Sequence, residues 1–154
     1  MASKESFTQE EWTKVAEAPM LAGLGVSMLD FGLVSFTKEF SAMIKAVAAA
    51  RAEYPNNQLV QSLVAELESK DQSPPAEEGE KKSTDQILSD LGRVAAIVDT
   101  RASSVDEARE FKTFVFGIGE KVANASGSGF LGLGEKVSDA ERDYLARLRS
   151  QLGI

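Results

Sequence analysis

The chain has 154 residues, of which 43% are hydrophobic and 27% are charged, as expected for a single soluble globular domain. A formal net charge of −7 argues against sequence-independent binding to nucleic acid, because an acidic surface repels a phosphate backbone. There is no cysteine and no histidine, which excludes disulfides, thiolate chemistry and the commonest general base near neutral pH.

The composition also limits which metals the chain can bind. Zinc sites are built mainly from cysteine and histidine, so a zinc site here would need carboxylates alone. A bound metal should therefore be a hard cation held by oxygen atoms, such as Ca²⁺ or Mg²⁺. No other cofactor is expected. Because no convergent pair of carboxylates is visible either, we expect a protein that is not an enzyme.

Residues 19–29 form the main apolar stretch, with no charged side chain between Pro19 and Leu29. A transmembrane helix needs about 20 apolar residues, so this stretch is too short to span a bilayer. Residues 1–12 contain no apolar run and do not resemble a signal peptide. We therefore expect a cytoplasmic protein without a transmembrane segment.

Helix starts are marked four times by a capping box. In this motif a serine or threonine hydroxyl accepts a hydrogen bond from the amide three residues later, and the side chain of that later residue reaches back. Apolar residues recur at helical spacing after each box, and no segment shows sustained two-residue alternation, so an all-α fold is predicted. The boxes are Thr8 with Glu11, Ser83 with Gln86, Ser104 with Glu107, and Ser138 with Glu141.

Pro19 interrupts the first helical region. Because proline lacks an amide hydrogen, it either begins a second helix or kinks a longer one. Apolar and small side chains fall on every side of a helical wheel over residues 19–29, which are therefore predicted to be buried all round. Ser35 is the expected cap of the next helix, which ends near Tyr54, and Asn56 is the expected cap of a shorter one.

Residues 69–83 separate two halves of the chain. They contain one hydrophobic residue, Ala76, and cannot bury enough surface to offset the entropy of ordering, so they are predicted to be a mobile linker. The halves, residues 8–68 and 84–153, are expected to pack as one bundle-like domain of about seven helices. Gly153 is placed to end the last helix.

The two halves share a pattern: an apolar helix, a turn containing glycine, a Val-Ser pair, and an acidic residue early in the following helix. In the first half the turn reads Asp-Phe-Gly-Leu-Val-Ser over residues 30–35, and Glu39 follows. In the second half a glycine-rich stretch over residues 126–137 ends in valine, and Ser138 and Glu141 follow. We interpret this pattern as an internal pseudo-repeat.

These stretches resemble the duplicated motif of the TerB-like family of tellurite-resistance-associated proteins. That motif is roughly Ala-x-x-Asp-Gly-x-Val-Ser-x-x-Glu between two helices, and it occurs twice in an all-helical domain. The chain departs from it because Phe31 separates Asp30 from Gly32, and because no aspartate precedes the glycine of the second copy. The resemblance implies an interaction module associated with stress responses and membrane-proximal complexes, which has a protein partner or self-associates.

The resemblance also implies that the acidic turns bind a divalent metal, with Asp30, Glu39 and Glu141 as the candidate ligands. Two of these residues have a structural interpretation as well. Asp30 can cap its turn by accepting hydrogen bonds from the amides that follow. Glu141, together with Asp139 and Asp143, can complement the dipole of the last helix while it serves as the reciprocal capping residue.

Two further patterns are open to a functional interpretation. Residues 127–132 match Gly-x-Gly-x-x-Gly, but a helix precedes them where a dinucleotide site needs a strand, so a flexible loop or a small apolar contact surface is favoured. Phenylalanines at helical spacing are interpreted as core. These phenylalanines are Phe31, Phe36, Phe40, Phe111, Phe114, Phe116 and Phe130. If they line a pocket instead, the alternative function is a helical binding module for a small apolar ligand, and a third possibility is an enzyme with an unrecognised carboxylate site.

Overall fold

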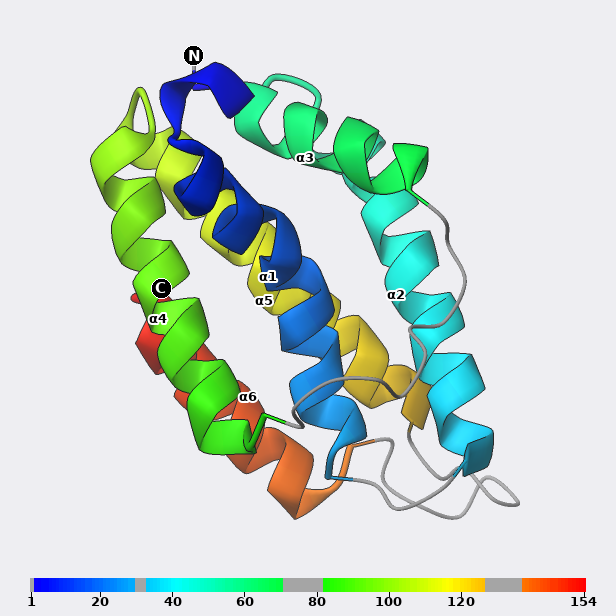
Figure 1. The fold of residues 1–154 in the computed structure, drawn as a ribbon. Coiled ribbons are helices and arrows are strands. Elements are labelled where there is room, and N and C mark those ends of the chain that lie inside the picture. Colours follow the sequence, from blue (N-terminus) through cyan, green and yellow to red (C-terminus); the bar gives the residue numbers. More distant parts are fainter. Residues whose placement is uncertain (1, 30–32, 71–81, 127–136) are drawn as a thin grey trace.

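The computed structural model describes the backbone of residues 2–29, 33–70, 82–126 and 137–154, and of these the side chains of all but residues 33–38 and 126. Over those ranges the chain forms six α-helices after a short 3₁₀ turn and has no strand, which confirms the all-α prediction. Figure 1 shows α1 packed over α5, with α4 and α6 on one side and α2 and α3 on the other. The elements are η1 (Lys4–Ser6), α1 (Gln9–Ser27), α2 (Leu33–Glu53), α3 (Gln58–Ser69), α4 (Thr84–Arg101), α5 (Val105–Ser126) and α6 (Asp139–Leu152).

The first helix, α1, is continuous and contains Pro19. Of the two alternatives, the longer helix through Pro19 is therefore correct, and the expected count of about seven helices becomes six over the described residues. A proline inside a helix removes one backbone hydrogen bond. Packing compensates for that loss, because α1 lies against both α4 and α5 and the proline itself is buried.

The prediction that residues 19–29 are buried all round is wrong. Met20 is 42% exposed and Leu24 is 37% exposed, whereas Ala22 and Val26 are fully buried. Met20 and Leu24 lie four residues apart and therefore share one face of the helix. That face borders a cavity between helices, while the opposite face supplies the core.

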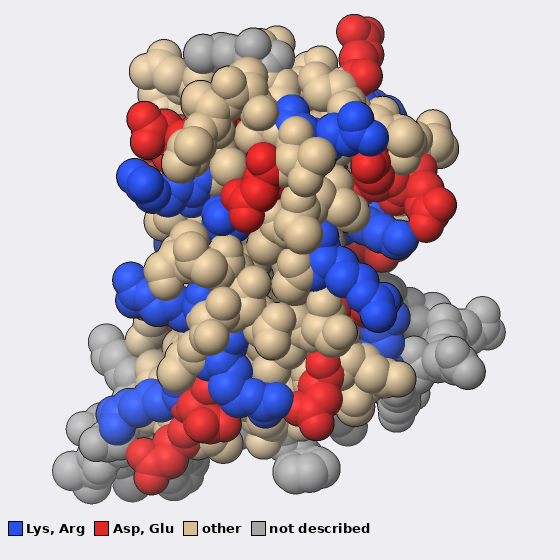
Figure 2. Space-filling view, turned by 90° about the vertical axis from the view of Figure 1, so that its left-hand side faces the viewer, with Lys and Arg blue, Asp and Glu red and all other residues tan. Residues whose placement is uncertain are grey.

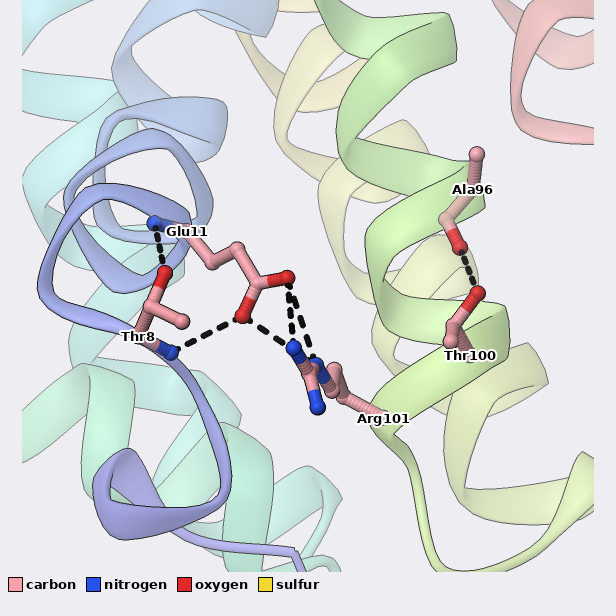
Figure 3. A network of polar contacts seen from close by, with 5 residues as sticks. All are labelled: Thr8, Glu11, Ala96, Thr100 and Arg101. Atoms are coloured by element: carbon pink, nitrogen blue, oxygen red, sulfur yellow. Dashed lines mark hydrogen bonds and ion pairs between the residues drawn. The ribbon is translucent and has the colours of Figure 1, made fainter.

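The capping box at Thr8 is confirmed, and it also connects two helices (Figure 3). The Thr8 hydroxyl accepts from the Glu11 amide at 3.2 Å, and the Glu11 carboxylate accepts from the Thr8 amide at 2.8 Å. The guanidinium of Arg101, at the end of α4, donates to both carboxylate oxygens of Glu11 at 2.9 to 3.2 Å. The hydrogen bonds from Arg101 and from the Thr8 amide lower the pKa of Glu11 and fix the start of α1 against the end of α4.

The box at Ser104 is confirmed in one half. The Ser104 hydroxyl accepts from the Glu107 amide at 3.0 Å, but the Glu107 carboxylate accepts from the amide and hydroxyl of Ser103, at 2.8 and 2.6 Å. The same carboxylate accepts from the Ala2 amide at 3.1 and 3.2 Å, so it joins the N-terminal segment to the start of α5. The remaining boxes are confirmed, at Ser83 and at Ser138.

Two predicted caps are wrong. Helix α2 begins two residues before Ser35, which therefore lies inside the first turn. Helix α3 is capped by Asn57 and not by Asn56, because the Asn57 side chain accepts from the Val60 amide at 3.0 Å. The side-chain amide of Asn57 also donates to the backbone carbonyl of Glu107 on α5 at 3.0 Å. This bond between distant segments favours the buried Asn57 over its exposed neighbour.

Most of the apolar residues at helical spacing in the second half are buried, but Ala125 and Leu145 are only partly buried. Phe7, just before α1, packs against Trp12 in its first turn, with ring centroids 5.6 Å apart, and the Trp12 indole donates to Glu66 on α3. Gly153 ends α6 in the left-handed conformation with φ of 70°, as predicted. The apolar residues that follow the Ser83 box at helical spacing are all buried, namely Ile87, Leu88, Leu91, Val94, Ala95 and Val98.

The predicted linker, residues 69–83, begins and ends at helix boundaries, since Ser69 closes α3 and Ser83 caps α4; residues 71–81 lie outside the described residues. Figure 2 shows basic and acidic side chains interspersed over one face of the molecule. Ion pairs such as Lys82 with Asp90, at 2.8 Å, balance the local charge. Among the helices described, none combines the length and the apolar character needed to cross a bilayer.

Candidate functional site

A cavity of about 50 Å³ lies between α1, α2 and α5, so that helices from both halves of the chain form its wall. Four of the lining residues come from α1, three from α2 and one from α5. We call this space the Glu39 cavity. It is lined by Met20, Gly23, Leu24, Ser27, Glu39, Phe40, Met43 and Val122.

Gly23 allows the three helices to approach closely beside the cavity. A Cβ atom at this position would lie 3.3 Å from Sδ of Met43 on α2 and 3.3 Å from Cγ2 of Val122 on α5. Any larger side chain would push against both neighbours or enter the cavity. At the rim, the partly exposed Met20 and Leu24 leave the cavity open to solvent.

Glu39 is the unusual member of the lining. Its side chain is only 1% exposed, and within the described part of the chain neither Oε1 nor Oε2 has a hydrogen-bond partner. An ionised carboxylate that is buried without a partner costs several kcal/mol, and buried polar groups in proteins nearly always have one. Glu39 is therefore the residue of this lining that calls for an explanation.

The rest of the described lining is almost entirely apolar. Its other polar side chain is Ser27, whose hydroxyl donates to the backbone carbonyl of Gly23 at 3.3 Å and keeps its oxygen lone pairs available as acceptors. Glu39 is the one ionisable group among the described lining residues. The cavity thus combines one acidic group with walls suited to a hydrocarbon.

The three candidate metal ligands have different outcomes. Asp30 lies outside the described residues. Glu39 lies in the cavity on α2, and Glu141 is buried in the first turn of α6. Over the described residues no group of three acidic side chains gathers closely enough to hold a metal ion. The metal site therefore stays a prediction, with Glu39 as the candidate ligand that lines an open space.

The structural role predicted for Glu141 is confirmed. Its carboxylate accepts from the Ser138 amide at 2.9 Å, and its own amide donates to the Ser138 hydroxyl at 3.2 Å. The neighbouring Asp139 and Asp143 are exposed at the same end of α6, and Asp139 lies 3.7 Å from Arg142. Acidic groups at a helix N-terminus complement the helix dipole.

Comparison with known proteins leaves the site to be interpreted from its own chemistry. No family model matches the chain, and no curated protein or solved structure matches it significantly. The resemblance to the TerB-like family therefore depends on the motif residues alone and stays a prediction.

The other sequence candidates contribute less to the site. Residues 127–132, the Gly-x-Gly-x-x-Gly match, lie outside the described residues. Of the phenylalanines, Phe111 and Phe114 are core, as predicted, and Phe40 borders the cavity. The side chains of Phe31, Phe36 and Phe130 lie outside the described part of the chain.

A second hollow of about 550 Å³ is lined by residues from the end of α4, from the first two thirds of α5 and from the C-terminal end of α6 and the residues after it. It carries three basic side chains, but at least two of them are already engaged within the protein. Lys112 pairs with Asp99 at 2.8 Å, and Arg149 lies 5.5 Å from the ring centre of Phe116. The basic side chains of this hollow are therefore less available to a ligand than the Glu39 carboxylate is.

Sequence reasoning selected Glu39 through motif spacing but missed the residues around it. Met20, Leu24 and Ser27 were assigned to a helix buried all round, so their position at an opening was not foreseen. The available signal was the spacing of Met20, Leu24 and Ser27, which places them on one helix face. Val122 comes from the other half of the chain, and no local pattern points to it.

Proposed function

We propose that this chain is a non-enzymatic binding module that takes up a cation at Glu39, in the cavity between α1, α2 and α5. The observation that carries this proposal is the carboxylate of Glu39, which is buried and has no partner among the described residues. A positively charged ligand would pair with this carboxylate, because a buried charge is stable only when it is paired or coordinated.

The absence of a second reactive group in the described lining favours binding over catalysis. Acid–base catalysis needs a positioned acid and base, and the chain has no histidine while Glu39 is the one ionisable side chain among the described lining residues. The TerB-like resemblance supports the same function, since it implies an interaction module with a divalent metal in its acidic turns. In that form of the proposal Glu39 would hold Ca²⁺ or Mg²⁺ together with Asp30 of the same motif, and Glu141 would belong to the second copy of the pseudo-repeat.

Titration calorimetry on the full chain tests this function. The panel contains Ca²⁺, Mg²⁺, a simple alkylammonium salt and a fatty acid. We expect one of the cations to bind with a stoichiometry of one and to raise the melting temperature, as a ligand specific for the folded state must. Glu39→Gln should abolish that binding, whereas Glu53→Gln, an exposed acid on the same helix, should retain it. A chain that binds none of the cations would contradict the proposal.

A small apolar ligand is the second candidate, and the apolar walls of the cavity favour it. The fatty acid in the panel separates the two candidates. Its carboxylate would be repelled by Glu39, so under the cation hypothesis it binds weakly and Glu39→Gln improves its binding. Tight binding of the fatty acid to the unmodified chain would favour the apolar-ligand function.

A further inference from the structure

The Glu39 cavity points to a particular class of cation, and this inference depends on the cation site proposed above. We infer that its ligand is a small organic ammonium ion with a short alkyl chain, and not a divalent metal. The ammonium group would pair with the Glu39 carboxylate, and the alkyl chain would contact the apolar wall formed by Met20, Leu24 and Met43.

Charge and donor number support a monovalent ligand. One carboxylate neutralises one positive charge. A primary ammonium has three N–H donors, and the described lining presents acceptors for them in the two open oxygens of Glu39 and the hydroxyl oxygen of Ser27. Hydrogen bonds between ionised partners are the strong ones in proteins. An ammonium ion would therefore satisfy both orphan oxygens without leaving a donor unused.

A divalent metal fits the same lining poorly. Ca²⁺ takes six to eight oxygen ligands, and Mg²⁺ needs six in a strict octahedron and keeps several water molecules. The described lining supplies oxygen side chains from Glu39 and Ser27 alone, and the described residues contain no group of three acids able to hold a metal. Retained water would face thioether, isobutyl and aromatic groups, which accept hydrogen bonds weakly or not at all.

The size of the cavity sets the length of the chain. A buried water molecule needs roughly 10–15 Å³ of cavity volume, so a cavity of about 50 Å³ admits about four non-hydrogen atoms. Propylammonium and butylammonium are therefore the best fit, and a longer chain would extend past the partly exposed Met20 and Leu24. Flexible methionine side chains adapt readily to such ligands.

Calorimetry and thermal unfolding with methylammonium, butylammonium, butanol, Mg²⁺ and Ca²⁺, at constant ionic strength, test the inference. We expect butylammonium to bind with a stoichiometry of one, and its affinity to exceed that of methylammonium by about fourfold for each added methylene that becomes buried. Glu39→Gln should weaken butylammonium at least about tenfold, as the loss of a charge-assisted pair does, while Glu53→Gln should leave it unchanged. Ser27→Ala, which keeps the charge, should weaken it by a smaller factor.

The possible outcomes separate this inference from the proposed function. Binding of Ca²⁺ or Mg²⁺ that requires Glu39, without binding of butylammonium, overturns the inference and leaves the cation site standing. Butanol binding as tightly as butylammonium shows that charge is not recognised and overturns it as well. If no cation binds, both the inference and the proposed function are wrong. If Glu39→Gln fails to fold, the inference is still tested by comparing the affinity of the unmodified chain for butylammonium with its affinities for butanol, Ca²⁺ and Mg²⁺.

Discussion

The hydroxyl of Tyr144 on α6 donates a hydrogen bond to the backbone carbonyl of Ala22, in the middle of α1, at 3.0 Å. Tyr144 is almost completely buried, and burial raises its pKa, so the hydroxyl keeps its proton and acts as the donor. The ring lies against Gly25, where a Cβ atom would come within 2.2 Å of the hydroxyl oxygen. A glycine on α1 and a tyrosine on α6 are therefore complementary in shape.

Tyr144→Phe tests the hydrogen bond separately from the packing. The substitution keeps the ring and removes the hydroxyl, so it should cost about 0.5–1.5 kcal/mol of unfolding free energy. Tyr54→Phe is the control, because no described residue bonds to the Tyr54 hydroxyl and its ring contact with Phe114 is kept. Urea unfolding should show a lower midpoint for the first variant and little change for the second. Equal midpoints for the two variants would show that the Tyr144 bond contributes nothing measurable.

Gly25→Ala tests the shape complementarity. A methyl group at this position would overlap the Tyr144 side chain, and forced repacking of a buried contact typically costs about 1–3 kcal/mol. Gly117→Ala is the matched control within a helix, since nothing lies within 4 Å of the Cβ atom it would add. That control should be stabilised by up to about 1 kcal/mol, because alanine is the better helix former. Denaturant midpoints that move in the same direction would contradict the role assigned to Gly25.

Local hydrogen bonding explains which parts of the fold could be predicted from the sequence. A capping box needs only residues three apart, so the boxes at Thr8, Ser83 and Ser138 were visible in the sequence. The cap at Asn57 was missed by one residue, because the hydrogen bond that selects it is donated by the Asn57 side-chain amide to a carbonyl on α5, far away in the sequence. Pro19 was ambiguous for a similar reason, since neighbouring helices stabilise the helix that it weakens.

The candidate site, too, could be predicted only where local sequence patterns were enough. Motif spacing identified Glu39, but whether a carboxylate is paired depends on which helices surround it, and this is not encoded in a local pattern. The wall opposite Glu39 includes Met20 and Leu24, which a helical wheel alone assigns to a buried stretch. Gly23 lets three helices approach closely beside the cavity, but the sequence shows this glycine without showing its neighbours.

Two phenylalanines that look equivalent in the sequence should behave differently. Phe114 is buried and lies edge-on to Phe111 and Tyr54, with ring centroids 6.3 and 6.1 Å away, so Phe114→Ala should cost about 3–5 kcal/mol. Phe40 is half-buried beside the cavity, so Phe40→Ala removes less buried area and should cost about half as much. Urea unfolding of both variants measures the difference. Equal costs would show that Phe40 is packed as tightly as Phe114.

The last prediction concerns the pH dependence that Glu107 gives to stability. Burial raises the pKa of this carboxyl, but hydrogen bonds from the Ser103 hydroxyl, the Ser103 amide and the Ala2 amide together outweigh burial and hold the pKa below its ordinary value of 4.5. The folded chain therefore releases this proton more readily than the unfolded chain does. The resulting stabilisation is complete above the ordinary pKa and is lost as the pH falls through the lowered one.

Glu107→Gln keeps the size of the side chain and removes its titration. At neutral pH the variant should be less stable by about 1–3 kcal/mol, because a charged acceptor is replaced by a neutral one and part of the hydrogen bonding to Ser103 is lost. As the pH falls below 4.5, the unmodified chain loses the contribution of the carboxylate and the variant does not, so the gap between them should narrow. Urea unfolding at a series of pH values measures the gap. A difference that stays constant between about pH 7 and pH 3 would show that the Glu107 carboxylate has the same pKa in the folded and unfolded chains.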